Sequence, residues 1–162
     1  MLNIKETNLK FGAMNRQHER ITRVVIHHVG DPPRDVSAEE IHRWHKENDW
    51  AGIGYHYVVR TDGTIERGRP EEYVGAHAQG FNTGSIGVNF AGNMDKMEPT
   101  PAQIESGAIL LADICTRHGI TPTPSTVVGH RDLMATSCPG KNLYDILQTL
   151  RGKAIWYQQN GY

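Results

Sequence analysis

Short apolar runs along the chain predict the strands of a β-sheet. Residues 21–26 read Ile-Thr-Arg-Val-Val-Ile, a β-branched run that ends at His27-His28 and is typical of a buried strand. Residues 52–60 and 65–68 flank the turn sequence Thr-Asp-Gly-Thr, so they predict two antiparallel strands of a hairpin. Two further strands are expected at residues 84–90 and 126–128.

Apolar positions at helical spacing predict the helices. Ser37 and Glu40 have the spacing of a capping box, and Ile41 and Trp44 follow on one face, so a helix is expected over residues 37–49. Two more helices are expected: one from Pro99 or Thr100 to near Gly119, and one that Asn142 caps and that carries Leu143, Ile146, Leu147 and Leu150.

Strands and helices are interspersed along the whole chain, which predicts an α/β fold with a central mixed sheet flanked by helices. Residues 1–20 are polar and weakly patterned, so we expect an N-terminal arm packed on the domain. Residues 21–150 would form the domain that carries the chemistry. Residues 151–162 would form a C-terminal tail or a short helix.

Composition narrows the possible partners. A chain of 162 residues with 38% hydrophobic content can bury one core, and a net charge of −1 gives no attraction to nucleic acid. No segment approaches the roughly 20 apolar residues of a membrane span, so no membrane insertion is expected. Residues 1–6 lack the basic start and apolar run of a signal peptide, so we expect the protein to be made in the cytoplasm. We also expect it to be a monomer.

Histidine and cysteine side chains suggest a metal site. His130 follows a predicted strand and Cys138 returns from the next loop, while His27 ends another predicted strand. Adjacent strand ends at one edge of the sheet can bring two imidazoles and one thiolate around a single ion. Three such ligands suit Zn²⁺ and leave the fourth tetrahedral position open for water, as in catalytic zinc sites.

Other candidate ligands have simpler interpretations. Strand alternation turns His28 away from His27, so we expect it to be packed or to support the site. On the helix over 37–49, we expect His45 to pack in the core and His42 to face solvent. Cys115 continues the apolar stripe of its helix and is expected to be a buried hydrophobe.

Several motifs carry a family resemblance. They are Val-Val-Ile-His-His at 24–28, Ile-His-Arg-Trp-His-Lys at 41–46, Gly-Tyr-His-Tyr-Val-Val-Arg-Thr-Asp-Gly-Thr at 54–64, Gly-Ala-His at 75–77, Asn-Thr-Gly-Ser-Ile-Gly-Val at 82–88, Thr-Pro-Ala-Gln at 100–103, and Gly-His through Cys-Pro at 129–139. In order and spacing, the chain resembles the N-acetylmuramoyl-L-alanine amidase family, which includes an amidase-type phage lysozyme and the animal peptidoglycan recognition proteins. The resemblance runs from about residue 21 to residue 147.

The resemblance implies roles for individual residues. It places the zinc ligands on His27, His130 and Cys138 and a catalytic tyrosine on Tyr55. Thr136 stands where some phage members have lysine, and we interpret its hydroxyl as a second group that stabilises the oxyanion. The loops that carry His77 and Asn82 suggest substrate contacts for these two residues.

The resemblance implies hydrolysis of the amide between N-acetylmuramic acid and L-alanine in peptidoglycan, with one Zn²⁺ ion. The enzyme would reach the cell wall after release, as a phage or prophage endolysin or as a bacterial autolysin. A peptidoglycan-binding module without activity is the alternative, although Cys138 and Tyr55 favour the enzyme. A zinc peptidase ranks last, because no His-Glu-x-x-His helix is present.

Overall fold

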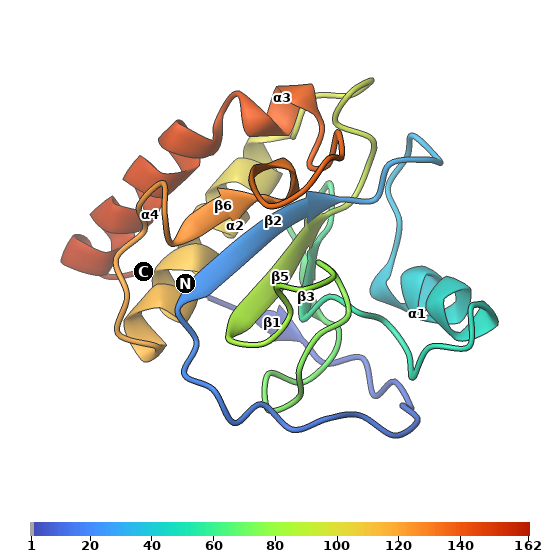
Figure 1. Cartoon of the computed structure of the whole chain (residues 1–162). Helices are drawn as coiled ribbons and strands as arrows, with labels where there is room; N and C mark the ends of the chain where they lie inside the picture. Colours follow the sequence, from blue (N-terminus) through green and yellow to red (C-terminus); the bar gives the residue numbers. More distant parts are fainter. Residues whose placement is uncertain (1) are drawn as a thin grey trace.

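The strands form one six-stranded sheet in the order β1-β4-β3-β5-β2-β6 in the computed structural model, which describes residues 2–162 (Figure 1). Along the chain the strands are β1 (Ile4–Lys5), β2 (Arg23–His28), β3 (Tyr57–Val59), β4 (Ile65–Arg67), β5 (Ser85–Phe90) and β6 (Val127–Gly129). Only β3 and β4 pair antiparallel, and the other neighbours are parallel. The prediction of a mixed sheet in an α/β fold is therefore confirmed.

The helices cover both faces of this sheet. They are α1 (Ala38–Glu47), α2 (Pro101–Arg117), the 3-10 turn η1 (His130–Asp132), α3 (Lys141–Tyr144) and α4 (Leu147–Asn160). In Figure 1, α2 and α4 lie side by side against one face, and α1 lies apart from them. Within residues 2–162, none of the helices has both the length and the apolar character needed to cross a bilayer.

The helix starts follow from their caps. Ser37 accepts the N–H of Glu40, and the Glu40 carboxylate reaches back to the Ser37 N–H, so α1 has the predicted capping box. Thr100 and Gln103 form the same arrangement at the start of α2.

The prediction of one last helix capped by Asn142 is wrong. Two helices occupy this region, and α3 begins after Gly140. Asn142 serves a different purpose: its backbone N–H donates to Met94 O (2.8 Å) and its side chain donates to Met97 O (2.9 Å). These bonds tie α3 to the segment after β5. Residues 151–160, where we expected a tail or short helix, form the larger part of α4.

Alternation along the central strands separates two apolar layers. Val24, Ile26, Val88 and Phe90 face α2 and α4 in the larger core. The positions that alternate with them, Val25 and His27 on β2 and Gly87 and Asn89 on β5, point to the opposite face, where His27 and Asn89 are direct partners in the parallel register. A smaller core beneath α1 contains Val36, Ala38, Ile41, Ile53, Val58 and Ala91. The face that carries His27 therefore holds polar side chains beside an apolar support.

A carboxylate network joins the segment after β4 to the end of α2. Glu71 accepts hydrogen bonds from Tyr57, Arg117 and His118. Burial opposes the ionisation of Glu71, but these three donors outweigh it and lower the pKa of Glu71 to about 2. The carboxylate is thus charged and paired across the neutral range.

At pH 7, Glu71→Gln is expected to lower the free energy of unfolding by about 3 kcal/mol, since a pKa of about 2 against an ordinary 4.5 is worth roughly 1.36 kcal/mol per unit. Because the folded-state pKa is the lower one, this contribution is present above pH 4.5 and is lost as the pH falls toward 2. Urea unfolding of both proteins from pH 7 to pH 3 measures the difference. Glu72→Gln is the control, because Glu72 pairs only at the exposed surface and should have little effect. A gap that does not narrow with acid contradicts this role.

Candidate functional site

Two neighbouring strands deliver the candidate metal ligands to one edge of the sheet. Ile26 pairs with Gly129 across β2 and β6, so His27 and His130 are the next residues along the two parallel strands. Their rings are 4.6 Å apart, centroid to centroid. The loop after η1 brings Cys138 back, and one ligand atom from each of His27, His130 and Cys138 lies within 4.8 Å of the others. The structure therefore brings together the three side chains that the sequence singled out.

The protonation of these groups follows from burial. His27 is fully buried, and burial, together with the His77 and His130 rings, lowers the pKa of His27 well below its usual value. A neutral imidazole keeps a lone pair for a metal. Burial also raises the pKa of the Cys138 thiol to about 12 in the absence of a cation. The Sγ of Cys138 lies 3.6 Å from Nδ1 of His27.

A chain of hydrogen bonds orients the His27 ring from the side that faces away from Cys138. Nε2 of His27 is 2.8 Å from Nδ1 of His77, and Nε2 of His77 is 3.3 Å from the hydroxyl of Ser85. That hydroxyl in turn donates to Phe81 O (2.8 Å). Nδ1 of His27 faces Sγ of Cys138, so keeping the Nδ1 lone pair for a metal requires the hydrogen to be on Nε2, which then donates to Nδ1 of His77. This arrangement favours the Nε2–H tautomer of His27.

A glycine makes room for His77. A Cβ at Gly87 of β5 would lie 2.6 Å from Cγ of the His77 ring. The ring therefore packs flat on the backbone of the central strand. His77 is also held by its own loop, because Asn82 Oδ1 accepts the N–H groups of His77 and Ala78 at 2.8 Å each.

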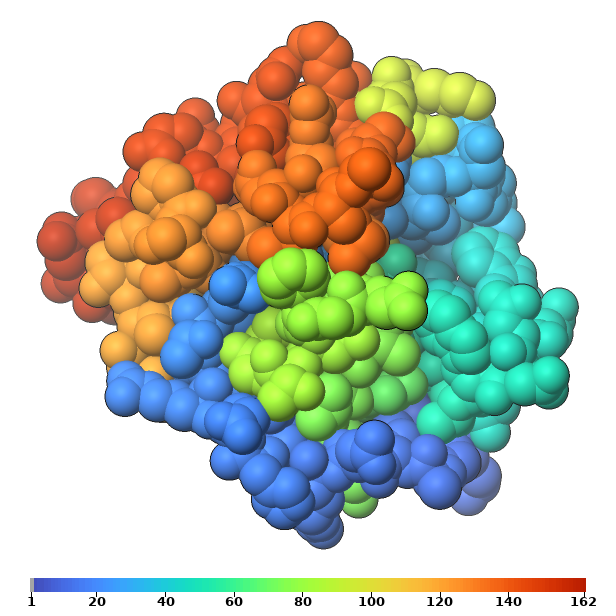
Figure 2. All heavy atoms as spheres, viewed as in Figure 1, coloured from blue at the N-terminus to red at the C-terminus, as the bar shows by residue number. Residues whose placement is uncertain are grey.

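A hollow of about 410 Å³ opens beside the three candidate ligands. Its lining residues are His45, Trp50, Tyr55, Ala76, His77, Ala78, Gln79, Asn82, His130 and Met134. Figure 2 shows the green segment after β4, the orange loop after β6 and the cyan end of α1 meeting around this hollow. The Tyr55 ring lies 4.9 Å from the His27 ring, centroid to centroid, so the phenol borders the metal-ligand cluster.

The positions of His42 and His45 correct the sequence interpretation. His42 was expected in solvent, but it is buried, accepts the N–H of Ile53 (3.0 Å) and contacts Lys10 O (2.9 Å). His45 was expected in the core, but it lines the hollow, and its ring lies tilted against the Trp50 ring with the centroids 4.5 Å apart. Its Nδ1 accepts the N–H of Gly54 (2.9 Å).

The same bonds explain why the strand predicted from residue 52 begins only at Tyr57. The N–H groups of Ile53 and Gly54 donate to imidazoles of α1, so they cannot donate to a neighbouring strand. Two histidines at i, i+3 on α1 thus set the path of the chain that carries Tyr55.

The remaining candidate residues, His28, Cys115 and Thr136, lie outside the group of three candidate metal ligands. His28 points to the other face, where its Nδ1 accepts the N–H of Met94 (2.9 Å), as strand alternation predicted. Cys115 is fully buried among apolar side chains, also as predicted. Thr136 is exposed and does not line the hollow, and its hydroxyl accepts the N–H of Cys138 (3.2 Å).

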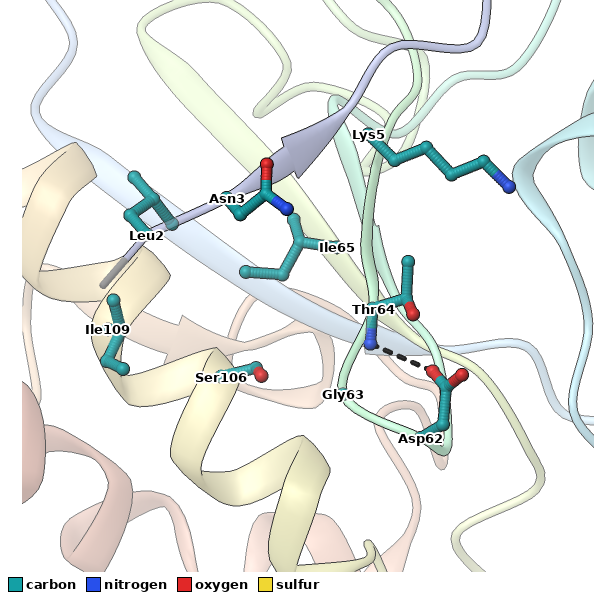
Figure 3. A pocket seen from close by; sticks show the side chains of 9 residues that line it. All are labelled: Leu2, Asn3, Lys5, Asp62, Gly63, Thr64, Ile65, Ser106 and Ile109. Atoms are coloured by element: carbon teal, nitrogen blue, oxygen red, sulfur yellow. Dashed lines mark hydrogen bonds between the residues drawn. The ribbon is translucent and has the colours of Figure 1, made fainter.

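Another hollow lies at the far edge of the sheet, between β1, the hairpin turn and α2 (Figure 3). Asp62 accepts the N–H of Thr64 there (2.9 Å), and Lys5 extends away from the turn. Within residues 2–162, His27, His130 and Cys138 are the group found with metal-ligand spacing, so this second hollow holds no comparable site.

Two imidazoles that follow adjacent parallel strands and a thiol from the next loop meet beside a hollow, and this arrangement places the chain in the class of hydrolases built around a metal-ligand cluster. The sequence model of the N-acetylmuramoyl-L-alanine amidases matches residues 17–141, and the chain belongs to this family.

Individual relatives agree with this assignment. The endolysin of Klebsiella phage KP32 is 38% identical over 114 residues, which cover 67% of this chain and 73% of the relative. The N-acetylmuramoyl-L-alanine amidase LysC from Clostridium intestinale URNW superposes with a TM-score of 0.83 at 33% identity, covering 92% of this chain and 97% of LysC. A chain from the complex of peptidoglycan recognition proteins LCa and LCx with tracheal cytotoxin gives a TM-score of 0.79 at 31% identity. The match covers 91% of this chain and 95% of that chain.

Sequence reasoning missed three residues around the site. His45 was assigned to the wrong environment, and Met134, whose Sδ lies 3.1 Å from Nε2 of His130, was not considered. Asn89 was missed as well, although its spacing in the strand after Asn82 puts it on the same face as Ser85 and Gly87. That alternation was the available signal.

Proposed function

We propose that this chain is a zinc-dependent N-acetylmuramoyl-L-alanine amidase that cuts the bond between the lactyl group of N-acetylmuramic acid and L-alanine. The observation that carries the proposal is the convergence of His27, His130 and Cys138 beside an open hollow that His130 and Tyr55 line. Membership of the amidase family supports the same reaction.

The donor set suits one zinc ion. Zinc bonds of about 2.0 Å to nitrogen and 2.3 Å to sulfur at a tetrahedral angle put the two ligand atoms about 3.5 Å apart. The Nδ1 of His27 and the Sγ of Cys138 are 3.6 Å apart. When bound, zinc supplies Lewis-acid polarisation of a carbonyl and lowers the pKa of the water it holds.

Tyr55 acts as a hydrogen-bond donor in this proposal. Burial and the Cys138 side chain raise the pKa of Tyr55, so the phenol keeps its hydrogen at neutral pH. It can donate that hydrogen to the scissile carbonyl oxygen as negative charge develops there. Thr136 accepts a hydrogen bond from the Cys138 N–H, which leaves its own hydroxyl hydrogen free. We assign this hydrogen to the oxyanion, as a second donor opposite Tyr55.

The opposite wall of the hollow binds the sugar and peptide. His45 accepts the Gly54 N–H at Nδ1, so its Nε2 carries a hydrogen that can be donated to substrate. Trp50 is 45% exposed beside it and offers a flat apolar surface. Asn82 holds the loop of His77 and Ala78 in shape and contributes to the same wall.

His77 supports zinc binding through His27 in addition to bordering the substrate. Replacing His77 with alanine removes the acceptor of the His27 Nε2 hydrogen, so zinc affinity is expected to fall by about 10- to 100-fold. Competition with a chromophoric chelator measures this. Gln79→Ala, an exposed change in the same loop, should leave zinc affinity as it is. Equal affinity of the wild-type protein and the His77→Ala variant contradicts the role.

Mass spectrometry of products from purified cell walls tests the reaction. The proposal predicts peptides with a free L-alanine amino terminus and glycan strands without peptide, abolished by a chelator and restored by zinc. A binding module would retain the wall without products, and a peptidase would leave L-alanine on muramic acid. Either of these results overturns the proposal.

The biological setting proposed is cell-wall lysis by an endolysin. Curated relatives with this name come from several phages, and the chain covers 73% of the first of them. We propose that peptidoglycan is the macromolecular partner, and tracheal cytotoxin bound to a structural neighbour supports this.

A further inference from the structure

Asn89 lies on the site face of the sheet, directly between two strands that carry the site. In the parallel register its partner on β2 is His27 and its partner on β3 is Val58. Residues paired in register point to the same face, so the carboxamide lies beside the His27 imidazole. The side chain is fully buried.

Neither polar atom of this carboxamide has a partner. Both Nδ2 and Oδ1 of Asn89 are buried and without a hydrogen bond, and within residues 2–162 the other such atom is Nε2 of Gln17. Gln103, equally buried, uses its amide fully, donating to Val59 O and Ala91 O and accepting from Thr100. A buried amide without partners costs free energy and calls for a functional explanation.

The candidate partner is the hydroxyl of Tyr55, because the Tyr55 ring lies 4.9 Å, centroid to centroid, from the ring of His27, and His27 is the register partner of Asn89. The Asn89 amide lies close enough to lower the pKa of this phenol, against the larger opposing effect of burial. No hydrogen bond of ordinary length joins the two side chains. Tyr55 also precedes β3, the strand that pairs with Asn89, so the two side chains belong to neighbouring segments.

We propose that Asn89 is a positioning residue that orients the Tyr55 hydroxyl during amide hydrolysis. Its Nδ2–H donates to the phenolic oxygen, and the phenol must then direct its own hydrogen away from Asn89, toward the substrate carbonyl. The Asn89 amide has no hydrogen-bond partner in the resting site, and it gains one when the Tyr55 hydroxyl moves toward the substrate. This inference rests on the proposed function, in which Tyr55 is the donor.

Asn89→Leu tests the proposal, because leucine has a similar volume and no polar atoms. We expect the melting temperature to rise by about 2–4 °C, since a buried unpartnered amide is removed. We expect kcat to fall about 10-fold, with KM and zinc content unchanged. Asn93→Leu is the matched control for stability: Asn93 is buried but bonded to Asp31 and Asp95, so the melting temperature should fall.

The decisive measurement combines this change with Tyr55→Phe. If Asn89 acts through the hydroxyl, Asn89→Leu has no further effect on kcat in the Tyr55→Phe background. An equal loss in both backgrounds, or a fully active Asn89→Leu variant beside an impaired Tyr55→Phe variant, overturns the inference alone. A fully active Tyr55→Phe variant overturns the proposed role of Tyr55 instead. Should leucine prevent folding, Asn89→Ala gives the same activity comparison.

Discussion

Cys138→Ser is expected to abolish activity, with a loss of at least about 100-fold in kcat/KM and less than one zinc ion retained per chain. Cys138 contributes the sole sulfur of the cluster, and its Sγ faces Nδ1 of His27 at 3.6 Å. A serine hydroxyl does not lose its proton at neutral pH and binds zinc poorly. Even changes to groups that only support metal ligands cost about 10- to 100-fold, so loss of a ligand should exceed that range.

Metal analysis and wall digestion of the same preparation measure both effects. Cys115→Ala provides the matched control, because Cys115 is buried in α2 among apolar side chains. That variant should keep its zinc and its activity. A Cys138→Ser variant that digests walls at the wild-type rate would show that the thiol is not a ligand needed for the reaction.

Tyr55→Phe carries the second largest expected effect, a fall of about 100- to 1000-fold in kcat with zinc content unchanged. This is the range found when one donor to an oxyanion is removed. Tyr55 borders the cluster, 4.9 Å from the His27 ring by centroids, and among residues 2–162 no other tyrosine lines the hollow. A smaller change in KM is expected, because the bond strengthens as charge develops.

Tyr57→Phe separates this effect from a general loss of hydroxyl groups. Tyr57 lies two residues further along but points to the opposite core, where it donates to Glu71. Its replacement should lower stability and leave kcat per folded molecule unchanged. Unchanged turnover in Tyr55→Phe would remove the phenol from the mechanism.

Much of the sheet could be predicted because its strands are short, β-branched and separated by recognisable turns. Asp62-Gly63 marked the β3–β4 hairpin, and the run before His27 marked β2. The meeting of His27 with His130 could also be predicted, since both follow parallel strands at one edge of the sheet. Short sequence patterns were thus enough to predict the strands, the hairpin turn and the meeting of the two histidines at the strand ends.

The errors concern groups whose partners are distant in sequence. Asparagine is a common residue type at helix N-caps, but Asn142 forms hydrogen bonds to Met94 O and Met97 O instead. His42 and His45 lie on one helix, and their environments depend on the backbone of residues 53–54, which helical periodicity does not describe.

The supporting groups of the site required the strand register. His77 reaches His27 only because Gly87 leaves space above the central strand, and Ser85 then contacts the far side of the imidazole. Asn89 reads in the sequence as an ordinary polar strand residue. Its pairing with His27 across β5 and β2 gives it a place beneath the site.

Anomalous diffraction at the zinc absorption edge, from crystals of the protein purified with zinc, tests the central claim most directly. We expect one peak per chain, within about 2.0–2.3 Å of Nδ1 of His27, an imidazole nitrogen of His130 and Sγ of Cys138. A wall-digesting preparation with no peak at this point, or with zinc held by other residues, would contradict the account.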